Sequence, residues 1–265
     1  MIDIFTERIL YPYQENILDY FKDYYNTGFI ALIPFFKIDS YNNDNKNFTN
    51  FEFLESKSSL FLSVRANNQQ YPSDLEKYER GEIITWENII NGSDINDKSD
   101  VLKALRTNSG FYRPVFKRPD LMNKLNDYTS KKKIWQPTEG VFDVFSKISI
   151  YKTLKLLNKK KIVIEDVFRE ESRIINIENL TEIDFINSLN HQDEFLYSED
   201  KEILFAIDSD SFFFLILANN DIMNLIISAN LFEGFKCEQD TKDGWEFNLI
   251  EQERLNRIEK QQENK

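Results

Sequence analysis

Two apolar runs in the last third of the chain, residues 202–207 and 212–217, constrain the fold more than any other feature of the sequence. Each run is short and rich in Ile, Leu and Phe, which is typical of a buried strand. The connection between them, Asp208-Ser209-Asp210-Ser211, consists of residue types that favour tight turns. Strands joined by so short a connection pair antiparallel, so the sequence predicts a hairpin at this place.

The segments around this hairpin predict an α+β fold with a mixed, mainly antiparallel sheet and packed helices. Short runs rich in β-favouring residues indicate further strands at residues 29–36, 162–167, 174–177 and 234–238. Helical spacing and capping residues indicate helices at residues 13–25, 73–78, 85–90, 99–106, 119–128, 139–157, 181–189 and 221–231. Residues 39–58 are rich in Asn and Asp and are expected to form a surface loop.

The helix at residues 139–157 has the most regular pattern. Val141, Phe145, Ile148 and Leu154 recur at helical spacing and are expected to be buried, with the lysines of the segment in water. Thr138 is a possible N-cap for this helix.

The chain is expected to form one globular α+β domain over residues 1–248, because no repeat and no Gly/Pro/Ser-rich linker divides it. A subdomain division, where there is one, is expected near residues 131–137. Residues 249–265 are polar and are expected to form a helical or frayed tail.

Composition indicates a globular protein of a reducing compartment. Hydrophobic residues make up 41% of the chain, with 23 Phe and 12 Tyr, which is far from the composition of a disordered chain. Cys237 is the only cysteine and cannot form an intramolecular disulfide, and no leader pattern precedes the acidic start. The longest apolar stretch is too short to span a membrane. We therefore expect a cytoplasmic protein that has no membrane contact.

The charge is unevenly distributed along the sequence. The net charge of −12 argues against a general nucleic-acid binder, because such proteins neutralise phosphates with Lys and Arg. Residues 113–161 nevertheless carry 13 basic and 4 acidic residues, whereas residues 162–248 carry 5 basic and 20 acidic ones. Partial pairing between the two segments is expected, with a surplus of carboxylates left over. Four carboxylates are the candidate interface for a basic protein partner: Glu194, Glu199, Asp200 and Glu202.

Two candidate sites for other ligands follow from the residue types. A loop at residues 106–118, with nearby residues, gathers groups that could grip a phosphate or carboxylate: Arg106, Arg113, Lys117, Arg118, Trp135 and Glu139. Asp208 and Asp210 could hold a divalent cation between them, but a hairpin turn explains the same residues and is the preferred interpretation. His191 is the only histidine, lies in a polar stretch and is not predicted to be catalytic. No cofactor is predicted.

Five blocks of the sequence carry a resemblance to a known family: Tyr71-Pro72-Ser73-Asp74, Ala104-Leu105-Arg106-Thr107, Pro137-Thr138-Glu139-Gly140, residues 208–213 and Phe232-Glu233-Gly234-Phe235. Together they resemble an uncharacterised bacterial family, domain of unknown function 2711. They span most of the chain, and the resemblance implies a Firmicute-like, cytoplasmic protein without an assigned activity. The order of hairpin, helix and short strand at the C-terminus also looks like that of immunity factors encoded beside bacterial toxins, a likeness that does not fix function.

Two hypotheses about function remain open at this point. The first is a non-enzymatic, immunity-type binding protein that uses its acidic C-terminal half. The second is an enzyme or sensor that binds a small anionic ligand at the loop of residues 106–118. The sequence contains no decisive catalytic signature, which favours the first hypothesis, and it predicts no oligomeric state.

Overall fold

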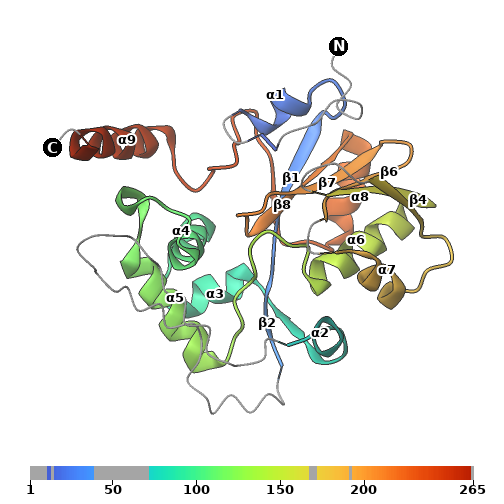
Figure 1. Ribbon diagram of the computed structural model, residues 1–265, viewed down its shortest axis with the longest axis horizontal. Coiled ribbons are helices and arrows are strands. Elements are labelled where there is room, and N and C mark those ends of the chain that lie inside the picture. Colours follow the sequence, from blue (N-terminus) through green and yellow to red (C-terminus); the bar gives the residue numbers. More distant parts are fainter. Residues whose placement is uncertain (1–10, 13–14, 39–71, 167–171, 191–192, 264–265) are drawn as a thin grey trace. The chain divides into compact units, whose positions relative to one another are not determined.

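The computed structural model describes residues 11–12, 15–38, 72–166, 172–190 and 193–263 (Figure 1). The chain divides into two compact units, which are considered separately. The sheet unit comprises Met1–Pro34 and Pro137–Lys265, and the helical unit comprises Phe35–Gln136. Whether residues 1–248 fold as one domain stays a prediction.

A seven-stranded antiparallel sheet forms the centre of the sheet unit. Its spatial order is β5 (Ser172–Asn176), β4 (Lys161–Asp166), β6 (Asp193–Ser198), β7 (Ile203–Ile207), β8 (Phe213–Ala218), β1 (Thr27–Leu32) and β9 (Gly234–Lys236). Every pair of neighbours in this order is antiparallel. Strands β7 and β8 form the expected hairpin, and the α+β fold class is confirmed.

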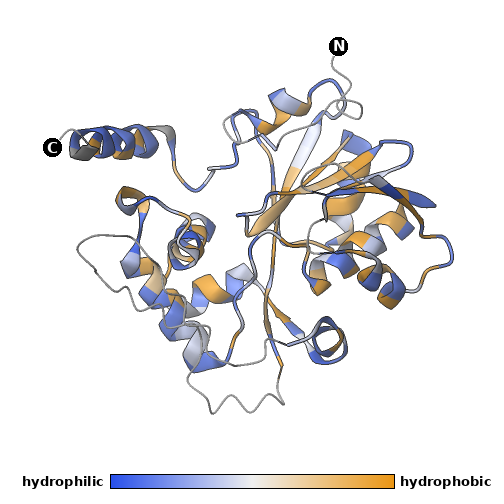
Figure 2. Cartoon of the chain, viewed as in Figure 1, coloured by the Kyte–Doolittle hydropathy of each residue, from blue (hydrophilic) through white to orange (hydrophobic). Residues whose placement is uncertain are grey.

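One face of this sheet is covered by three helices, α6 (Val144–Leu156), α7 (Glu182–Ser188) and α8 (Asn220–Ala229). Alternate strand residues such as Phe205 and Ile216 point into the same buried cluster as Ile150 and Leu154 of α6. Phe185 of α7 belongs to the same cluster. Strands β7 and β8 are buried along their whole length and appear almost continuously apolar in Figure 2. Their length and burial explain why the sequence identifies them most clearly.

The other face of the sheet is covered in part by α1 (Ile17–Phe21) and by the chain after β9. The indole ring of Trp245 packs edge-on against Phe213 of β8 and Phe235 of β9. The backbone N–H of Cys237 donates to the carbonyl of Gly28 at 2.8 Å, which extends the pairing beyond β9. The sheet is therefore buried on both faces over much of its width.

Helix α6 begins later than predicted. The expected start near Glu139 fails because Gly140 has a left-handed backbone with φ of 69°, which interrupts a helix. The side chain of Asp143 accepts from the N–H of Ser146 and caps the helix instead. Lys147 is 3% exposed and donates to the carbonyl oxygens of Ile186 and Leu189, so the expectation that all lysines here lie in water was wrong.

The remaining buried positions of this segment follow the prediction only in part. Phe145 and Leu154 are buried as expected. Val141 and Ile148 are only half-buried, and Ile150 is the position that is fully buried. The buried face of α6 is thus rotated from the expected one.

The helical unit contains α2 (Asp74–Arg80), α3 (Trp86–Ser93), α4 (Lys98–Ser109), a 3₁₀ turn (Pro114–Phe116), α5 (Pro119–Lys132) and a ladder of β2 (Phe35–Lys37) with β3 (Glu82–Ile84). Capping boxes at Ser73 and Thr85 begin α2 and α3. Three side-chain amides form a closed ring that ties α4 to α5: Asn108 donates to Gln136, Gln136 to Asn126, and Asn126 back to Asn108.

Most predicted elements have counterparts in the structure, with ends shifted by a few residues. The region predicted as one strand at residues 29–36 is divided between β1 and β2, and β3 and β6 were not predicted. The polar C-terminal segment forms α9 (Leu249–Glu263). The predicted loop at residues 39–58 and His191 lie outside the described residues. Within the described ranges, no helix combines the length and apolar character needed to cross a membrane.

Candidate functional site

Arg118, the residue before α5, is engaged by a carboxylate close to it in sequence. Its Nε donates to Oδ1 of Asp120 at 2.9 Å and its NH2 donates to Oδ2 at 2.7 Å. The hydrogen bonds from Arg118 hold the pKa of Asp120 below its usual value. Asp120 thus forms the bidentate contact with Arg118 that we had expected an external anion to form.

Two other cations of the predicted anion site, Arg106 and Arg113, lie against aromatic rings. Arg106 is 3% exposed, and its guanidinium carbon lies 5.0 Å from the ring centre of Phe111. Arg113 is exposed, with its guanidinium carbon 5.1 Å from the ring centre of Phe116. Lys117 follows Phe116 and is half-buried. Cation–π contacts of this kind stabilise the local fold and use one face of each guanidinium.

Trp135 and Glu139 belong to different units. The ring of Trp135 stacks on Phe36 with 6.1 Å between ring centres, and the two residues exchange both backbone hydrogen bonds. Trp135 lies in the helical unit, whereas the half-buried Glu139 lies in the sheet unit. An anion site with all six residues would have to combine both units, and it stays a prediction.

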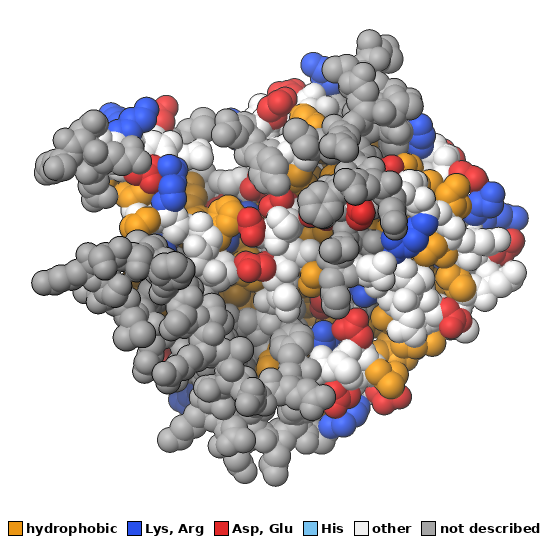
Figure 3. Space-filling model, in the orientation of Figure 1, with side chains coloured by type: hydrophobic (Ala, Val, Ile, Leu, Met, Phe, Trp, Pro, Cys, Tyr) orange, Lys and Arg blue, Asp and Glu red, His pale blue; other side chains and the backbone are white. Residues whose placement is uncertain are grey.

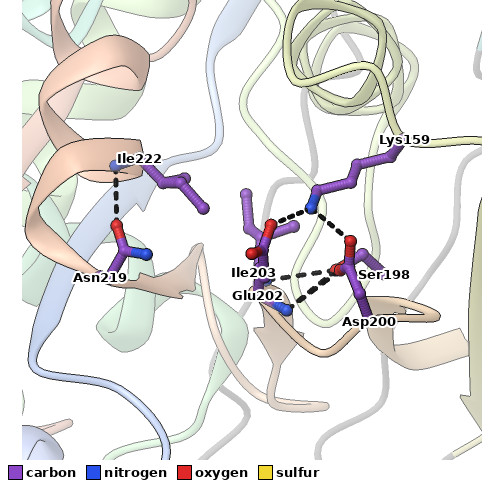
Figure 4. A network of polar contacts seen from close by, with 7 residues as sticks. All are labelled: Lys159, Ser198, Asp200, Glu202, Ile203, Asn219 and Ile222. Atoms are coloured by element: carbon purple, nitrogen blue, oxygen red, sulfur yellow. Dashed lines mark hydrogen bonds and ion pairs between the residues drawn. The ribbon is translucent and has the colours of Figure 1, made fainter.

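A second candidate is the turn between β6 and β7, which we call the acidic turn and define as Glu199, Asp200 and Glu202. Lys159 lies beneath it with a side chain that is 8% exposed, and its ammonium group contacts Glu202 and, at 2.6 Å, Asp200 (Figure 4). The hydroxyl of Ser198 donates to Asp200 and accepts from the backbone N–H groups of Glu202 and Ile203. Lys159 and Ser198 therefore hold the carboxylate of Asp200 in position, and Lys159 holds that of Glu202.

The electrostatics of the acidic turn follow from this arrangement. Burial alone lowers the pKa of Lys159, but the hydrogen bonds that its ammonium group donates to Asp200 and Glu202 outweigh this effect, and the pKa is raised overall. Burial likewise raises the pKa of Asp200, and the contacts with Lys159 and Ser198 reverse this, so that its pKa is lowered. Both partners are charged at neutral pH. The side chains of Asp200 and Glu202 are about half exposed, at 51% and 53%.

Glu194 does not lie with the other three predicted interface carboxylates. It is the second residue of β6, whereas the acidic turn follows the last, and it is 8% exposed. Burial raises its pKa to about 7, and the charges of Asp208 and Asp166 act in the same direction. Glu194 is thus a buried carboxyl group that titrates near neutral pH.

The chain at residues 208–211 has the tight conformation expected of a hairpin connection. The N–H of Ser211 donates to the carbonyl of Asp208 at 3.0 Å, and the N–H of Asp210 donates to the Asp208 carboxylate at 3.3 Å. Gly140 packs on this turn and donates its N–H to the carbonyl of Ser211. Asp208 is buried and Asp210 is exposed. Among the described residues, no group of three or more His, Cys, Asp or Glu side chains is arranged to hold a metal ion.

The basic and acidic segments pair with each other. Every one of the following ion pairs joins a lysine of residues 113–161 to a carboxylate of residues 162–248: Lys152–Glu182, Lys159–Asp200, Lys159–Glu202, Lys160–Glu178 and Lys161–Glu199. On the face shown in Figure 3, basic and acidic side chains are intermixed. The expected partial pairing between the two segments is confirmed.

These features belong to a chain whose family can be established from its sequence. The sequence model of the family described as protein of unknown function (DUF2711) matches residues 13–247. The chain belongs to this family. No curated protein and no solved structure matches it.

For this member of the family, sequence reasoning missed the residues that organise the acidic turn. Lys159 stood out only as part of a run of three lysines, and Ser198 carried no signal. Tyr197 was also missed; its hydroxyl donates to the buried carboxylate of Glu165 at 2.9 Å. Since β6 was not predicted, the adjacency of β4, β6 and β7 in the sheet could not be predicted either.

Proposed function

We propose that the protein is a non-catalytic binding protein that engages a basic protein partner through the acidic turn. The observation that carries this proposal is the position of Lys159, which is buried beneath Asp200 and Glu202 while both carboxylates remain half exposed. The cation fixes the acidic side chains and leaves them facing water. Carboxylates held in place in this way can attract a basic surface without first losing conformational freedom.

The contacts that the lysines of the basic segment make within the protein support the same proposal. Four of these lysines pair with carboxylates of the acidic segment: Lys152, Lys159, Lys160 and Lys161. Lys155 donates to the carbonyl oxygens of Ile177 and Glu178 at 2.8 Å each. These cations hold the sheet unit together instead of presenting a positive field to an anion. Carboxylates exceed cations in the chain by 12, so acidic charge is what remains for an external partner.

The alternative, a small anionic ligand at the loop of residues 106–118, is less favoured because Asp120 already engages Arg118. It retains Arg106 and Arg113 as its candidates. The two functions differ in which charges matter, so one experiment can distinguish them.

The test uses the intact chain as bait for proteins from its own cells, followed by stopped-flow measurement of association with the protein captured. Glu199→Lys is the reporter variant, because Glu199 forms an exposed ion pair with Lys161 and the fold should tolerate the change. We expect a basic partner whose association slows by roughly two- to fivefold in the variant and slows further with salt.

Glu79→Lys is the matched control, an exposed charge reversal in the helical unit that should leave the association rate unchanged. A partner without excess basic charge, or equal slowing by both reversals, contradicts the proposal. A small anion that co-purifies with the protein and is lost on replacing Arg106 and Arg113 by Gln would support the alternative.

A further inference from the structure

The seven-stranded sheet ends at β5, and in the described part of the chain no strand lies beyond it. All five residues of β5 pair with β4, from Ser172 opposite Glu165 to Asn176 opposite Lys161. The other side of β5 therefore presents backbone N–H and C=O groups that a further strand could bind.

The sequence of β5 has little of the usual protection of a strand edge. Natural edge strands are typically kept very short, or they carry charged side chains (lysine above all), proline or a bulge. The one charged side chain of β5, Arg173, donates to the carbonyl of Ser188 at the end of α7. Strand β9, at the opposite edge, is three residues long and ends in Lys236. Strand β5 is longer, reads Ser-Arg-Ile-Ile-Asn, contains neither lysine nor proline, and keeps a regular register with β4.

The edge is also firmly attached to the rest of the sheet unit. Arg173 donates to the carbonyl of Ser188 at 3.0 Å, and the side chain of Asn176 accepts from the N–H of Glu178. Ile175 packs against the core cluster. Ile174, on the other face of the strand, is 60% exposed. A strand that is already ordered loses little entropy when another strand pairs with it.

We propose that β5 is the contact through which two copies of this chain associate, pairing antiparallel about a two-fold axis at Ile174. In this register Ile174 lies opposite Ile174 of the other copy, Arg173 opposite Ile175, and Ser172 opposite Asn176. No like charges face each other, and the exposed Ile174 gains an apolar β-branched neighbour. The two sheets become one continuous sheet, and the contact is isologous, as a closed dimer requires.

Charge distinguishes a second copy from the basic partner proposed for the acidic turn. Arg173 is the only charged residue of β5, so this edge offers no carboxylate to a basic strand. Two copies with a net charge of −12 each repel one another, and salt screens this repulsion. The dimer should therefore tighten with salt, whereas binding of a basic partner should weaken, so either proposal can fail without the other.

The first experiment is sedimentation velocity of the full chain at increasing protein concentration. We expect a dimer whose dissociation constant falls by about tenfold between about 0.01 M and 0.1 M salt. Ile174→Lys places two like charges face to face and should give a monomer with unchanged circular dichroism, whereas Ile174→Val should remain dimeric. Ile83→Lys, at a position 48% exposed on β3, is the matched control and should also remain dimeric.

The second experiment tests the register by cross-linking. Cys237 is 5% exposed and burial raises its pKa to about 12, so it is an unreactive background. Under mild oxidation Ile174→Cys should form a covalent dimer, because paired residues across a two-fold axis lie within disulfide distance. Leu225→Cys, at an exposed position of α8, should not. A wild-type chain that stays monomeric, a dimer that survives Ile174→Lys, or equal cross-linking of both cysteine variants would overturn the proposal.

Discussion

Single residues with unusual surroundings give the sharpest expectations, and Glu194 is the first of them. Its carboxyl has a pKa of about 7 in the folded protein, against 4.5 for an unperturbed glutamate. Between these values the folded state holds a proton that the unfolded state has released. Stability is therefore full below about pH 4.5, falls as the pH rises to about 7, and is constant above that as far as this group is concerned.

Replacing Glu194 by Gln should remove this dependence. Above pH 7 the variant should be more stable than the wild type by on the order of 1–3 kcal/mol, because an amide has no charge to bury. Urea titrations at pH 5 and pH 8 measure the effect. A variant that loses the same stability as the wild type between these two pH values would show that Glu194 is not the group responsible.

Gly140 is a second residue with unusual surroundings, because they leave no room for a side chain. Its φ is +69°, and a Cβ at this position would lie 2.0 Å from the backbone carbonyl oxygen of Ser209. Gly140→Ala must therefore displace the 208–211 turn and should cost about 2–4 kcal/mol in thermal or chemical unfolding.

Gly244→Ala is the matched control for Gly140. Its Cβ would meet no atom within 4 Å, so the change should be neutral or slightly stabilising. Equal effects of the two substitutions would mean that the 208–211 turn does not pack on Gly140 as described.

At the scale of helices and strands, those that were predicted clearly are the ones marked by residues within or next to the element itself. The hairpin of β7 and β8 is clear because both strands are buried on both faces and the turn residues between them are of favoured types. Helix α7 is clear because Thr181 and Asp184 form a capping box. The start of α6 was misplaced because the left-handed Gly140 depends on contact with Ser209, about 70 residues away, which no local pattern contains.

Strand β6 was missed for a similar reason. Its sequence, Asp-Glu-Phe-Leu-Tyr-Ser, begins with two acids and is ordered by pairing with β4 and β7 on either side. The candidate site was predicted incompletely for the same reason. Its acidic residues were identified from the sequence. Lys159 and Ser198, which order them, come together only when β4, β6 and β7 are adjacent. Glu194 was grouped with residues at the other end of its strand for the same reason.

The acidic turn gives a prediction at this scale, because two neighbouring lysines contact it in different ways. Lys159 is buried beneath two carboxylates, whereas Lys161 forms one exposed pair with Glu199 at 3.1 Å. Lys159→Met should cost about 1–3 kcal/mol, since it leaves two adjacent carboxylates without their cation. Lys161→Met should cost less than about 1 kcal/mol, as is usual for exposed pairs. Chemical denaturation of both variants decides the matter, and a larger loss from Lys161→Met would contradict the described network.

At the scale of the whole molecule, the division of charge along the sequence becomes a set of ion pairs within one unit. The part of the basic segment after residue 136 contributes α6 and the start of β4, and the acidic segment contributes the strands and helix packed against them. The part at residues 113–136 belongs to the helical unit. This pairing means that the surplus of carboxylates, and not the basic stretch, determines how the protein responds to salt.

That response gives the last prediction. Most of the ion pairs are at least half exposed on one side, and each contributes little, so screening them costs little. Repulsion within a chain of net charge −12 is spread over the whole surface, and screening relieves it. At pH 7.5 the melting temperature should therefore rise by about 2–5 °C between about 0.01 M and 0.15 M NaCl. Near the sequence isoelectric point of 4.8 the repulsion vanishes, and the same salt should leave the melting temperature unchanged or lower it. A melting temperature that falls with salt at pH 7.5 would show that the ion pairs outweigh the surplus, and Lys159→Met should then abolish much of that fall.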